Sequence, residues 1–327
     1  MEVEEVDVGE VVSDVFLVSE ARLSTDKRGG KYYSLVLNCD NGDQVDAKVW
    51  SDNIADDLEA GSAIEVLARV DEFRGDKQLN IQRYDLIPED DFDPSPYIRT
   101  TEINEEDAFD TLFNWEREEF QNRFLKRLLT KFYKTESFAK QFKCSPAAER
   151  HHHNYRGGLV EHTFEMWELS ERLYNQYRDN VDRELLLAGT ALHDIGKIKC
   201  YRLVSGVSQS TSHSDLLDHV FISASMVSNL WDKIMTEDFL GDEKDEAGRT
   251  KAMLLHMILS HHGKRDWGAA VLPKCPEAIL LHFCDHISAT MKTCFDAIEN
   301  TPEGEDRTEW LSLMDANRQL VVSPDTI

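Results

Sequence analysis

Cysteine pairs and long apolar runs are missing from this sequence of 327 residues. Its six cysteines contain no CxxC pair, which argues against a zinc ribbon or a dense disulfide framework and favours a reducing compartment. No uninterrupted apolar run approaches the roughly 18 residues of a membrane span, and the acidic residues 1–5 are unlike a signal peptide. We therefore expect a cytoplasmic protein that does not bind membranes.

Basic residues are also scarce, because 36 lysines and arginines stand against 62 aspartates and glutamates, a formal net charge of −26. Such a charge keeps a chain in solution and argues against a general coat on nucleic acid, so any nucleic-acid site must be local. The excess of acidic residues is also compatible with a protein from a salty habitat. The 41% of hydrophobic residues can build a sizeable core, and the length favours two domains.

The first 90 residues have a strand-like pattern. Alternating apolar and polar positions predict strands at residues 11–23, 32–40, 44–50, 63–70 and 79–87. Asn41-Gly42 predicts a hairpin between the second and third strands, because both residues tolerate positive φ. A short helix is expected at residues 53–60, before Gly61. Three strands, one helix and two strands is the order of an OB-fold barrel.

The pattern changes after the barrel. Three prolines and four acidic residues between Pro88 and Pro96 suit a linker. From residue 105 the apolar period is helical, and six apolar residues fall on one helical face: Phe120, Phe124, Leu125, Leu128, Leu129 and Phe132. Further helices are predicted at residues 159–177, 183–192, 216–234, 250–261 and 277–298. We therefore expect a multidomain chain, with a small all-β barrel followed by an all-α bundle.

Histidine is confined to the helical part, because all twelve histidines lie between residues 151 and 286. Each of several predicted helices contributes one or two of the candidate metal ligands: His162, His193-Asp194, His219, His261-His262 and Asp285. Imidazoles and carboxylates bind manganese, iron, cobalt, nickel or zinc, and converging helices can supply them from inside a bundle. The lone histidines His256, His282 and His286 are expected to be packing residues, and residues 151–153 receive no role.

The spacing of His162, His193-Asp194 and Asp285 resembles the H…HD…D signature of the HD-domain metal phosphohydrolases. Residues 191–197 read ALHDIGK and match the HD loop. His219 and His261-His262 match the extra ligands of the HD subfamilies that hold two metals.

Two longer stretches narrow the resemblance: residues 152–163 read HHNYRGGLVEHT and residues 259–264 read LSHHGK. Both are similar to the YhaM family of 3′-to-5′ exoribonucleases, which join an N-terminal OB fold to an HD domain. Ala289 and residues 315–318 also fit, and the resemblance covers nearly the whole chain. One departure is Ser288, where we expect an aspartate in this family. The expected divisions are an OB fold at 1–87, a linker at 88–101, a helical connector at 102–150, the HD domain at 151–300 and a tail at 301–327.

The resemblance implies two divalent metal ions, manganese first, with iron, cobalt, nickel or zinc as alternatives. Because Asp194 has two carboxylate oxygens and can bridge, we expect one ion on His162, His193, Asp194 and Asp285. The other ion is expected on Asp194, His219, His261 and His262. A hydroxide between the ions would attack phosphorus, and Lys197 would add positive charge to the transition state. Asp194 and Lys197 are thus the predicted catalytic residues.

Local basic and aromatic residues mark the candidate nucleic-acid contacts. On the barrel these are the loop cations Lys27, Arg28, Lys31, Arg74 and Lys77, with the stacking candidates Tyr32, Tyr33, Trp50 and Phe73. The alternative is that the cations only solubilise the loops and the aromatics fill the barrel core. Residues 120–134 hold no acidic residue and place Arg123, Arg127, Lys131 and Lys134 in a row along a helix, beside Lys126. This cationic row would guide a phosphate backbone, or would be a solvated face or a subunit contact.

The sequence and the resemblance thus predict a metal-dependent 3′-to-5′ exoribonuclease that acts on single-stranded RNA as a homo-oligomer, with single-stranded DNA as a second candidate substrate. One alternative is an HD-type phosphodiesterase or nucleotidase for small nucleotides. It is less favoured because Gly263-Lys264 is not followed by the Gly-Tyr-Pro pattern of the cyclic dinucleotide branch. The other alternative is a non-catalytic OB-fold adaptor, which an intact ligand set disfavours.

Overall fold

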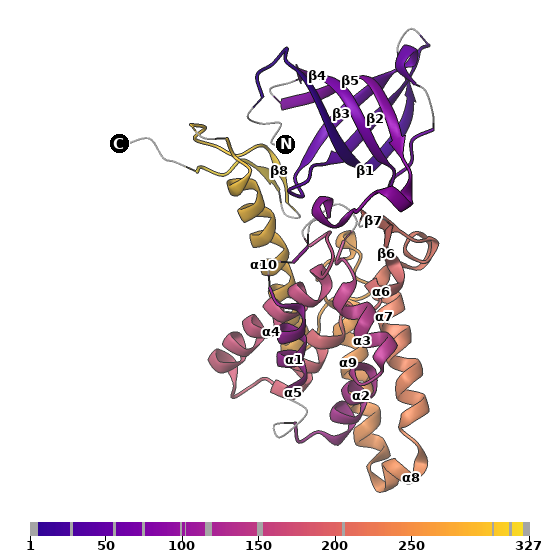
Figure 1. Cartoon of the computed structure of the whole chain (residues 1–327). Helices are drawn as coiled ribbons and strands as arrows, with labels where there is room; N and C mark the ends of the chain where they lie inside the picture. Colours follow the sequence, from indigo (N-terminus) through magenta and orange to yellow (C-terminus); the bar gives the residue numbers. More distant parts are fainter. Residues whose placement is uncertain are drawn as a thin grey trace, which may run out of the picture. The chain divides into compact units, whose positions relative to one another are not determined.

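The computed structural model describes residues 6–26, 29–54, 57–73, 76–98, 100–101, 103–114, 120–148, 153–204, 207–302, 304–313 and 316–322. The chain forms two compact units: Met1–Thr100 with Leu203–Gln209, and Thr101–Arg202 with Ser210–Ile327. Figure 1 shows strands in the first unit and helices in most of the second. Among the described residues, no helix combines the length and the apolar character needed to cross a membrane.

The first unit is a closed barrel of five strands (Figure 1). These are β1 (Val11–Thr25), β2 (Lys31–Asn38), β3 (Gln44–Trp50), β4 (Ala63–Phe73) and β5 (Asp76–Ile87), in the spatial order β1-β2-β3-β5-β4. The pair of β3 and β5 is parallel and the other pairs are antiparallel. Large side chains fill the interior, among them Phe16, Leu35, Leu37, Ile64, Leu79 and Ile81. The predicted OB-like barrel is confirmed.

The connections of the barrel confirm one prediction and correct another. Gly42 has a φ of 85°, and the Cys39 amide donates to the Asp43 carbonyl at 2.8 Å, so Asn41-Gly42 does form the predicted hairpin turn. The predicted helix at residues 53–60 is wrong for the residues described there. Ser51–Asn53 is a single 3₁₀ turn, and residues 57–59 are irregular. Leu58 is the only fully buried residue described in this segment, so a helix there would have little apolar contact to stabilise it.

The second unit is a helical bundle (Figure 1). Its described helices are α1 (Glu105–Asn114), α2 (Arg123–Tyr133), α3 (Glu136–Cys144), α4 (Gly158–Tyr177), α5 (Arg183–Leu192), α6 (Lys197–Cys200), α7 (Ser212–Ile234), α8 (Glu237–Leu240), α9 (Lys244–Ser260) and α10 (Pro276–Glu299). It also contains a small hairpin of β8 (Leu311–Ser312) with β9 (Asn317–Arg318). A second hairpin, β6 (Tyr201–Val204) with β7 (Val207–Ser210), belongs mostly to the first unit, which includes Leu203–Gln209.

The five longer predicted helices correspond to α4, α5, α7, α9 and α10, and α5 has the predicted bounds. The sequence does not predict α3 or the β6–β7 hairpin. It also misses a break in α7, where Asp218 leaves the helical conformation with a φ of 61° and a ψ of 152°. Left-handed backbone is uncommon outside glycine, so this break is a specific feature of the chain.

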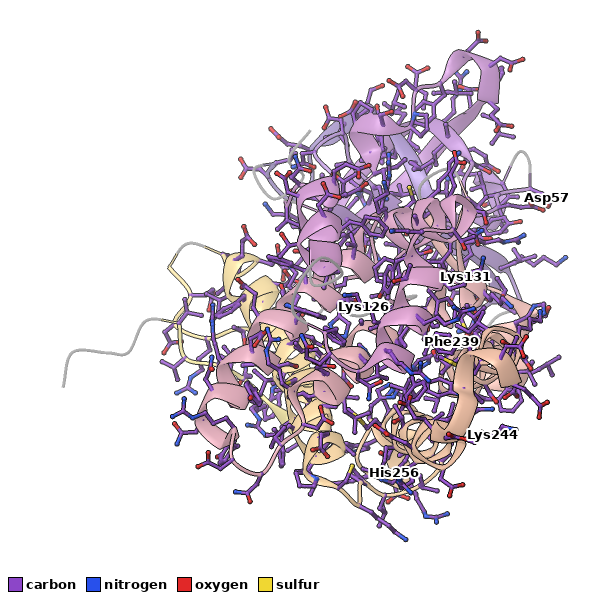
Figure 2. The ribbon with its side chains drawn as sticks, turned by 90° about the horizontal axis from the view of Figure 1, so that it is seen from below. Asp57, Lys126, Lys131, Phe239, Lys244 and His256 are labelled. Atoms are coloured by element: carbon purple, nitrogen blue, oxygen red, sulfur yellow. The ribbon has the colours of Figure 1, made fainter. Side chains whose placement is uncertain are left out.

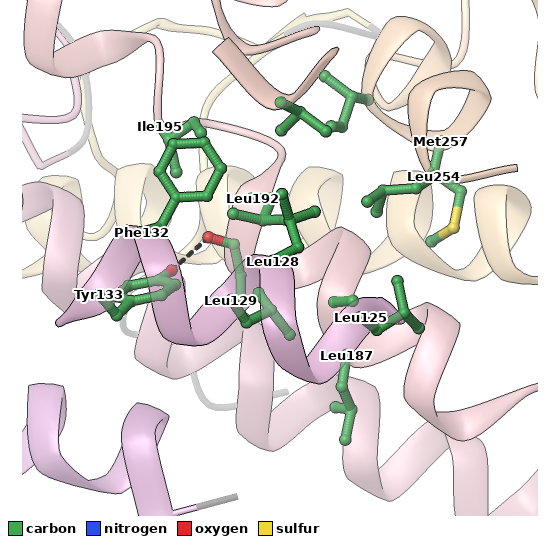
Figure 3. Close-up of a cluster of buried hydrophobic side chains, with 14 of the residues drawn as sticks. Leu125, Leu128, Leu129, Phe132, Tyr133, Leu187, Leu192, Ile195, Leu254 and Met257 are labelled. Atoms are coloured by element: carbon green, nitrogen blue, oxygen red, sulfur yellow. Dashed lines mark hydrogen bonds between the residues drawn. The ribbon is translucent and has the colours of Figure 1, made fainter. Parts of the chain in front are cut away.

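The apolar face predicted on α2 forms part of the bundle core. Phe124, Leu125, Leu128, Leu129 and Phe132 are all at most 6% exposed. Figure 3 shows side chains of this helix gathered with others from α5 and α9. The buried Tyr133 hydroxyl donates to the Ala191 carbonyl at 2.5 Å, the dashed line in Figure 3. This bond anchors the end of α5, from which His193-Asp194 follows directly.

Candidate metal centre

The seven predicted metal ligands meet in one place inside the helical unit. They come from α4 (His162), the end of α5 (His193 and Asp194), α7 (His219), the end of α9 (His261 and His262) and α10 (Asp285). His162, His193, Asp194 and His261 are at most 3% exposed. The structure therefore brings residues more than 120 positions apart in the sequence into one buried cluster.

Asp194 lies at the middle of the cluster, and its two oxygens face different histidine pairs. Oδ2 lies 3.2 Å from His193 Nε2 and 3.6 Å from His162 Nε2. Oδ1 lies 3.4 Å from His219 Nε2 and 3.6 Å from His261 Nε2.

The two remaining members of the cluster lie on opposite sides of Asp194. Asp285 Oδ1 is 3.3 Å from His162 Nε2, while His262 Nε2 is 3.2 Å from His219 Nε2. His162 and His193 thus lie nearer one oxygen of Asp194, and His219 and His261 lie nearer the other. The assignment of the seven side chains to two separate ions stays a prediction.

Hydrogen bonds to the other ring nitrogen orient the histidines. His193 Nδ1 donates to the Thr190 carbonyl at 2.8 Å, and His261 Nδ1 donates to the Ile258 carbonyl at 2.7 Å. A carbonyl can only accept, so Nδ1 carries the proton in both rings and the Nε2 lone pair faces the cluster. Partners of this kind fix the tautomer of metal-binding histidines in proteins.

Asp218 orients His219 and explains the break in α7. Its Oδ1 lies 2.7 Å from His219 Nδ1 and accepts from the Val220 amide at 3.1 Å. The carboxylate therefore caps the longer part of α7 while it turns His219 Nε2 toward Asp194. The hydrogen bond from His219 lowers the pKa of Asp218, which keeps it ionised. Sequence reasoning missed Asp218, although its position next to His219 was a usable signal.

Ser288 has a defined place beside His162, although an aspartate was expected there. Its hydroxyl donates to Glu165 Oε2 at 2.8 Å, and its Oγ lies 3.1 Å from His162 Nδ1. Because the one hydroxyl proton points to Glu165, His162 Nδ1 donates to the serine oxygen. The same Glu165 oxygen lies 3.5 Å from Nε2 of the fully buried His153. Nothing in the sequence pattern points to Glu165. His151 and His152 lie outside the described residues.

The ionisation states of both carboxylates and of His261 favour binding of a cation in the cluster. Burial would raise the pKa of Asp194, but His193 and Lys197 lower it well below its usual value. Burial would likewise raise the pKa of Asp285, and His162 lowers it. Burial lowers the pKa of His261 well below its usual value, and His262 and His193 add to the effect. Ionised carboxylates and neutral imidazoles are the forms that bind metals.

Several cluster atoms also lack partners of their own. Asp194 Oδ1, His193 Nε2 and His261 Nε2 are buried without a hydrogen bond among the described residues. Leaving buried polar atoms unsatisfied is costly, and buried polar atoms are normally bonded. The set of imidazoles and carboxylates matches the preferences of divalent transition metals. The residues present therefore fit a divalent metal centre.

A small pocket of about 120 Å³ opens beside the cluster. His219, His262 and Asp285 line it on one side, with Lys197 and Tyr201 nearby and three alanines, Ala147, Ala148 and Ala289, among the remaining walls. Lys197 Nζ lies 2.6 Å from Asp194 Oδ2. Burial alone would lower the pKa of Lys197, but Asp194 raises it, so the ammonium group stays charged.

The lone histidines have packing contacts. His256 Nε2 accepts from the Lys274 amide at 2.9 Å, away from the cluster. His282 Nδ1 lies 2.9 Å from the His261 carbonyl, and the His286 ring stacks on Trp267 with centroids 5.3 Å apart. His282 and His286 also line the pocket, which the sequence did not predict.

The barrel candidates separate into exposed and buried residues. Tyr32 and Trp50 are cross-strand neighbours on β2 and β3, with ring centroids 5.2 Å apart, and Trp50 is 40% exposed. Tyr33 is a correction: its ring is 6% exposed and belongs to the barrel core, so no base can stack on it. Lys31 is exposed at the start of β2, and Lys77 is half-buried on β5. Lys27, Arg28, Arg74 and the Phe73 side chain lie outside the described residues.

Arg123 and Arg127 of the cationic row have defined contacts within the helical unit. Arg123 donates to the carbonyls of Phe239 and Leu240 and pairs with Glu243 at 2.6 Å. Arg127 donates to the Ile234 carbonyl at 3.0 Å, and its guanidinium lies 4.1 Å from the centre of the Phe239 ring. Lys131 is exposed on α2, as Figure 2 shows, and Lys134 follows at the end of the helix. Arg123 and Arg127 thus tie α2 to the segment after α7, and an RNA contact of the row stays a prediction.

Comparison with known proteins agrees with this geometry. The HD domain family model matches residues 159–290. The 3′-5′ exoribonuclease YhaM of Listeria welshimeri is 30% identical over 303 residues, which cover 91% of each chain. YhaM of Oceanobacillus iheyensis is 31% identical over 314 residues, covering 94% of this chain and 93% of its own. This chain belongs to the YhaM family of 3′-5′ exoribonucleases. The family predicted from the motifs is confirmed.

A solved structure of the second OB-fold domain of replication protein A from Methanococcus maripaludis is 18% identical. It covers 27% of this chain and 95% of that chain, with a TM-score of 0.24. The OB assignment rests on the closed strand order β1-β2-β3-β5-β4 of the barrel itself.

Proposed function

We propose that the cluster holds two divalent cations, manganese first, and hydrolyses single-stranded RNA from its 3′ end. One set of ligands is His162, His193, Asp194 and Asp285, and the other is Asp194, His219, His261 and His262. The observation that carries the proposal is the orientation of Asp194, whose two oxygens face two different histidine pairs. A carboxylate placed in this way suits a bridging ligand.

The bound cations would lower the pKa of a water molecule and neutralise charge on the phosphate during in-line displacement. The shifted pKa values keep Asp194 and Asp285 ionised and His162 and His261 neutral, and burial excludes bulk water. Lys197, kept protonated by Asp194, can place a positive charge beside the scissile phosphate. The pocket beside Lys197 and Tyr201 is walled partly by alanines, which leaves room for a terminal nucleotide.

The barrel supplies a surface for single strands in this proposal. The exposed Trp50 and the half-buried Tyr32 form an aromatic pair on β3 and β2, the strands on which OB folds bind oligonucleotides. Bases of any sequence can stack on such rings. Lys31 and Lys77, with Lys27, Arg28 and Arg74, would contact phosphates, as would the exposed Lys131 and Lys134 of the cationic row. A reducing cytoplasm suits the six cysteines, which are all free thiols.

A time course on 5′-labelled single-stranded RNA, with Mn²⁺ or with EDTA, tests the activity. We expect a ladder that shortens from the 3′ end with Mn²⁺ and no cleavage with EDTA. Cleavage confined to small nucleotides would instead support the phosphodiesterase alternative. Binding of RNA without any cleavage, in a protein shown to contain metal, would support the adaptor alternative.

The barrel surface is tested separately by Trp50→Ala. Base stacking on one aromatic side chain is worth about 1–3 kcal/mol, so binding of a long single strand should weaken roughly 5-fold to 100-fold. Cleavage of a dinucleotide should hardly change. Trp310→Ala is the matched control, because Trp310 is 70% exposed outside the barrel. Equal losses of activity on long and short substrates would show that Trp50 is not part of the binding surface.

A further inference from the structure

The face of α10 turned away from the metal centre is entirely apolar. Every residue classed as exposed between Pro276 and Ile298 is nonpolar. Apart from Pro276 they are large, 39–57% exposed, and form the α10 stripe: Ile279, Phe283, Ile287, Met291, Phe295 and Ile298. Figure 1 shows α10 along one side of the helical unit.

The exposed Glu299, the last residue of α10, ends the stripe, and the other charged groups of α10 lie elsewhere on the helix. Glu277 is buried, Asp285 points into the metal cluster, and Lys292 pairs with Asp296 at 3.0 Å. In a chain of net charge −26 with 30% charged residues, a long face without exposed charge is unusual. An apolar patch of this kind on a protein surface marks an interaction site.

The area of the α10 stripe is large enough for a subunit contact. With about 200 Å² for a side chain of this size, the exposed fractions leave on the order of 600 Å² of apolar surface. Two copies meeting through it would bury roughly 1,200 Å², the lower end of the range for specific stable interfaces.

The spacing of the α10 stripe suits contact with itself. Five of its residues, from Ile279 to Phe295, follow one another at intervals of four and form a single ridge along the helix. Ridges of this type on two identical helices pack into each other's grooves, the commonest helix pairing in globular proteins. Because the face carries no exposed charge, two strongly acidic chains can meet there without placing like charges in direct contact.

The barrel unit has no comparable row of exposed apolar side chains among its described residues. Val11 pairs across the sheet with Arg69 and Leu67 with Arg83, while the exposed Trp50 pairs with Tyr32. A second copy of the chain has the complementary surface by symmetry.

We propose that the α10 stripe is a homodimer interface, in which two α10 helices pack against each other across a two-fold axis. The inference is independent of the proposed nuclease activity. It gives the predicted homo-oligomer a defined surface. Since α10 also carries Asp285, each subunit would present the metal centre and the dimer contact on opposite faces of one helix.

Light scattering after gel filtration, with sedimentation velocity, tests the contact on the full chain. The wild type should have the mass of a dimer, twice 37.6 kDa. Met291→Asp and Phe295→Asp each place a charge in the interface and should raise the dimer dissociation constant at least about 30-fold, the cost of losing one strong interface residue. Tyr177→Asp is the matched control, because Tyr177 is 53% exposed at the end of α4. It should remain dimeric.

A monomeric wild type at micromolar concentration, or variants with an unchanged mass, would overturn the proposal. Circular dichroism checks that the variants are folded.

A cysteine substitution tests the same contact without disrupting it. Ile287 lies in the middle of the stripe, near the proposed axis, so Ile287→Cys should form an intersubunit disulfide on mild oxidation. Tyr177→Cys should not, and failure of Ile287→Cys to cross-link a folded protein would also contradict the interface.

Discussion

His162 and Ser288 are joined across the helical unit by a 3.1 Å contact between Nδ1 and Oγ, although they are 126 residues apart in the sequence. The serine hydroxyl donates its own hydrogen bond to Glu165 Oε2. A carboxylate thereby acts on a candidate metal ligand through a hydroxyl rather than directly. Burial lowers the pKa of His162 while Asp285 opposes that effect, so the ring is held in the neutral form.

We predict that Ser288→Ala weakens Mn²⁺ binding about 10-fold to 100-fold, the usual effect of removing a partner of a metal ligand. Isothermal titration measures the affinity without relying on activity. Ser19→Ala is the control, because Ser19 is as buried as Ser288 and is bonded to Gln44 inside the barrel. Equal affinities for Ser288→Ala and the wild type would show that the contact does not position His162.

Asp194→Asn should remove activity and most bound metal, because an amide cannot replace a carboxylate shared by two cations. Elemental analysis of the purified variant measures the metal content, and circular dichroism shows whether the helices persist. Asp232→Asn, on the surface of α7, serves as the control. A variant with the metal content of the wild type would contradict the bridging role of Asp194.

Metal affinity should fall as the pH is lowered through neutrality. Burial would lower the pKa of His193, but Asp194 and Asp285 raise it above its usual 6.5. A cation must displace the proton on Nε2, so protons compete at a higher pH than for an ordinary histidine. Titrations with Mn²⁺ in buffers of different ionisation enthalpy count the protons released. A midpoint well below pH 6.5 would show that His193 is not protonated before metal binds.

Arg127 and Lys131 should separate folding from RNA binding in the cationic row. Arg127→Ala removes the bond to the Ile234 carbonyl and should lower the free energy of unfolding by about 1 kcal/mol. Lys131→Glu leaves that bond intact and should raise KM for long RNA while kcat on very short substrates stays nearly constant. Urea unfolding and initial rates measure the two effects. Lys233→Glu, also exposed, is the control, and an equal KM for both lysine variants would contradict guidance by the row.

The sequence alone was sufficient for the ligand cluster. Histidine is confined to one domain, and the H…HD…D spacing selects four of the residues that the fold gathers. The resemblance to two-metal HD subfamilies adds His219, His261 and His262, which lie in the same cluster. The helical period found the buried face of α2, because burial of an apolar stripe depends mainly on local pattern. Barrel strands and the Asn41-Gly42 turn were predictable for the same reason.

The features that the sequence does not predict depend on tertiary contacts. Arg127 meets a carbonyl 107 residues away, and Ser288 and Glu165 meet only after α4 and α10 have packed together. Tyr33 was assigned to the surface because strand alternation does not show which face points inward until the barrel closes. The break at Asp218 requires a backbone conformation that residue type alone seldom reveals.

That break has a consequence for how α7 unfolds locally. Residues 212–217 form only a short turn on one side of Asp218, while the longer part of the helix continues to Ile234. A helical segment of so few residues is marginal by itself, and helix propagation cannot pass through a left-handed residue. Its amides should therefore exchange with solvent much faster than those of the longer part. His219 belongs to the longer part of α7. Local unfolding of residues 212–217 should therefore leave the candidate metal centre in place.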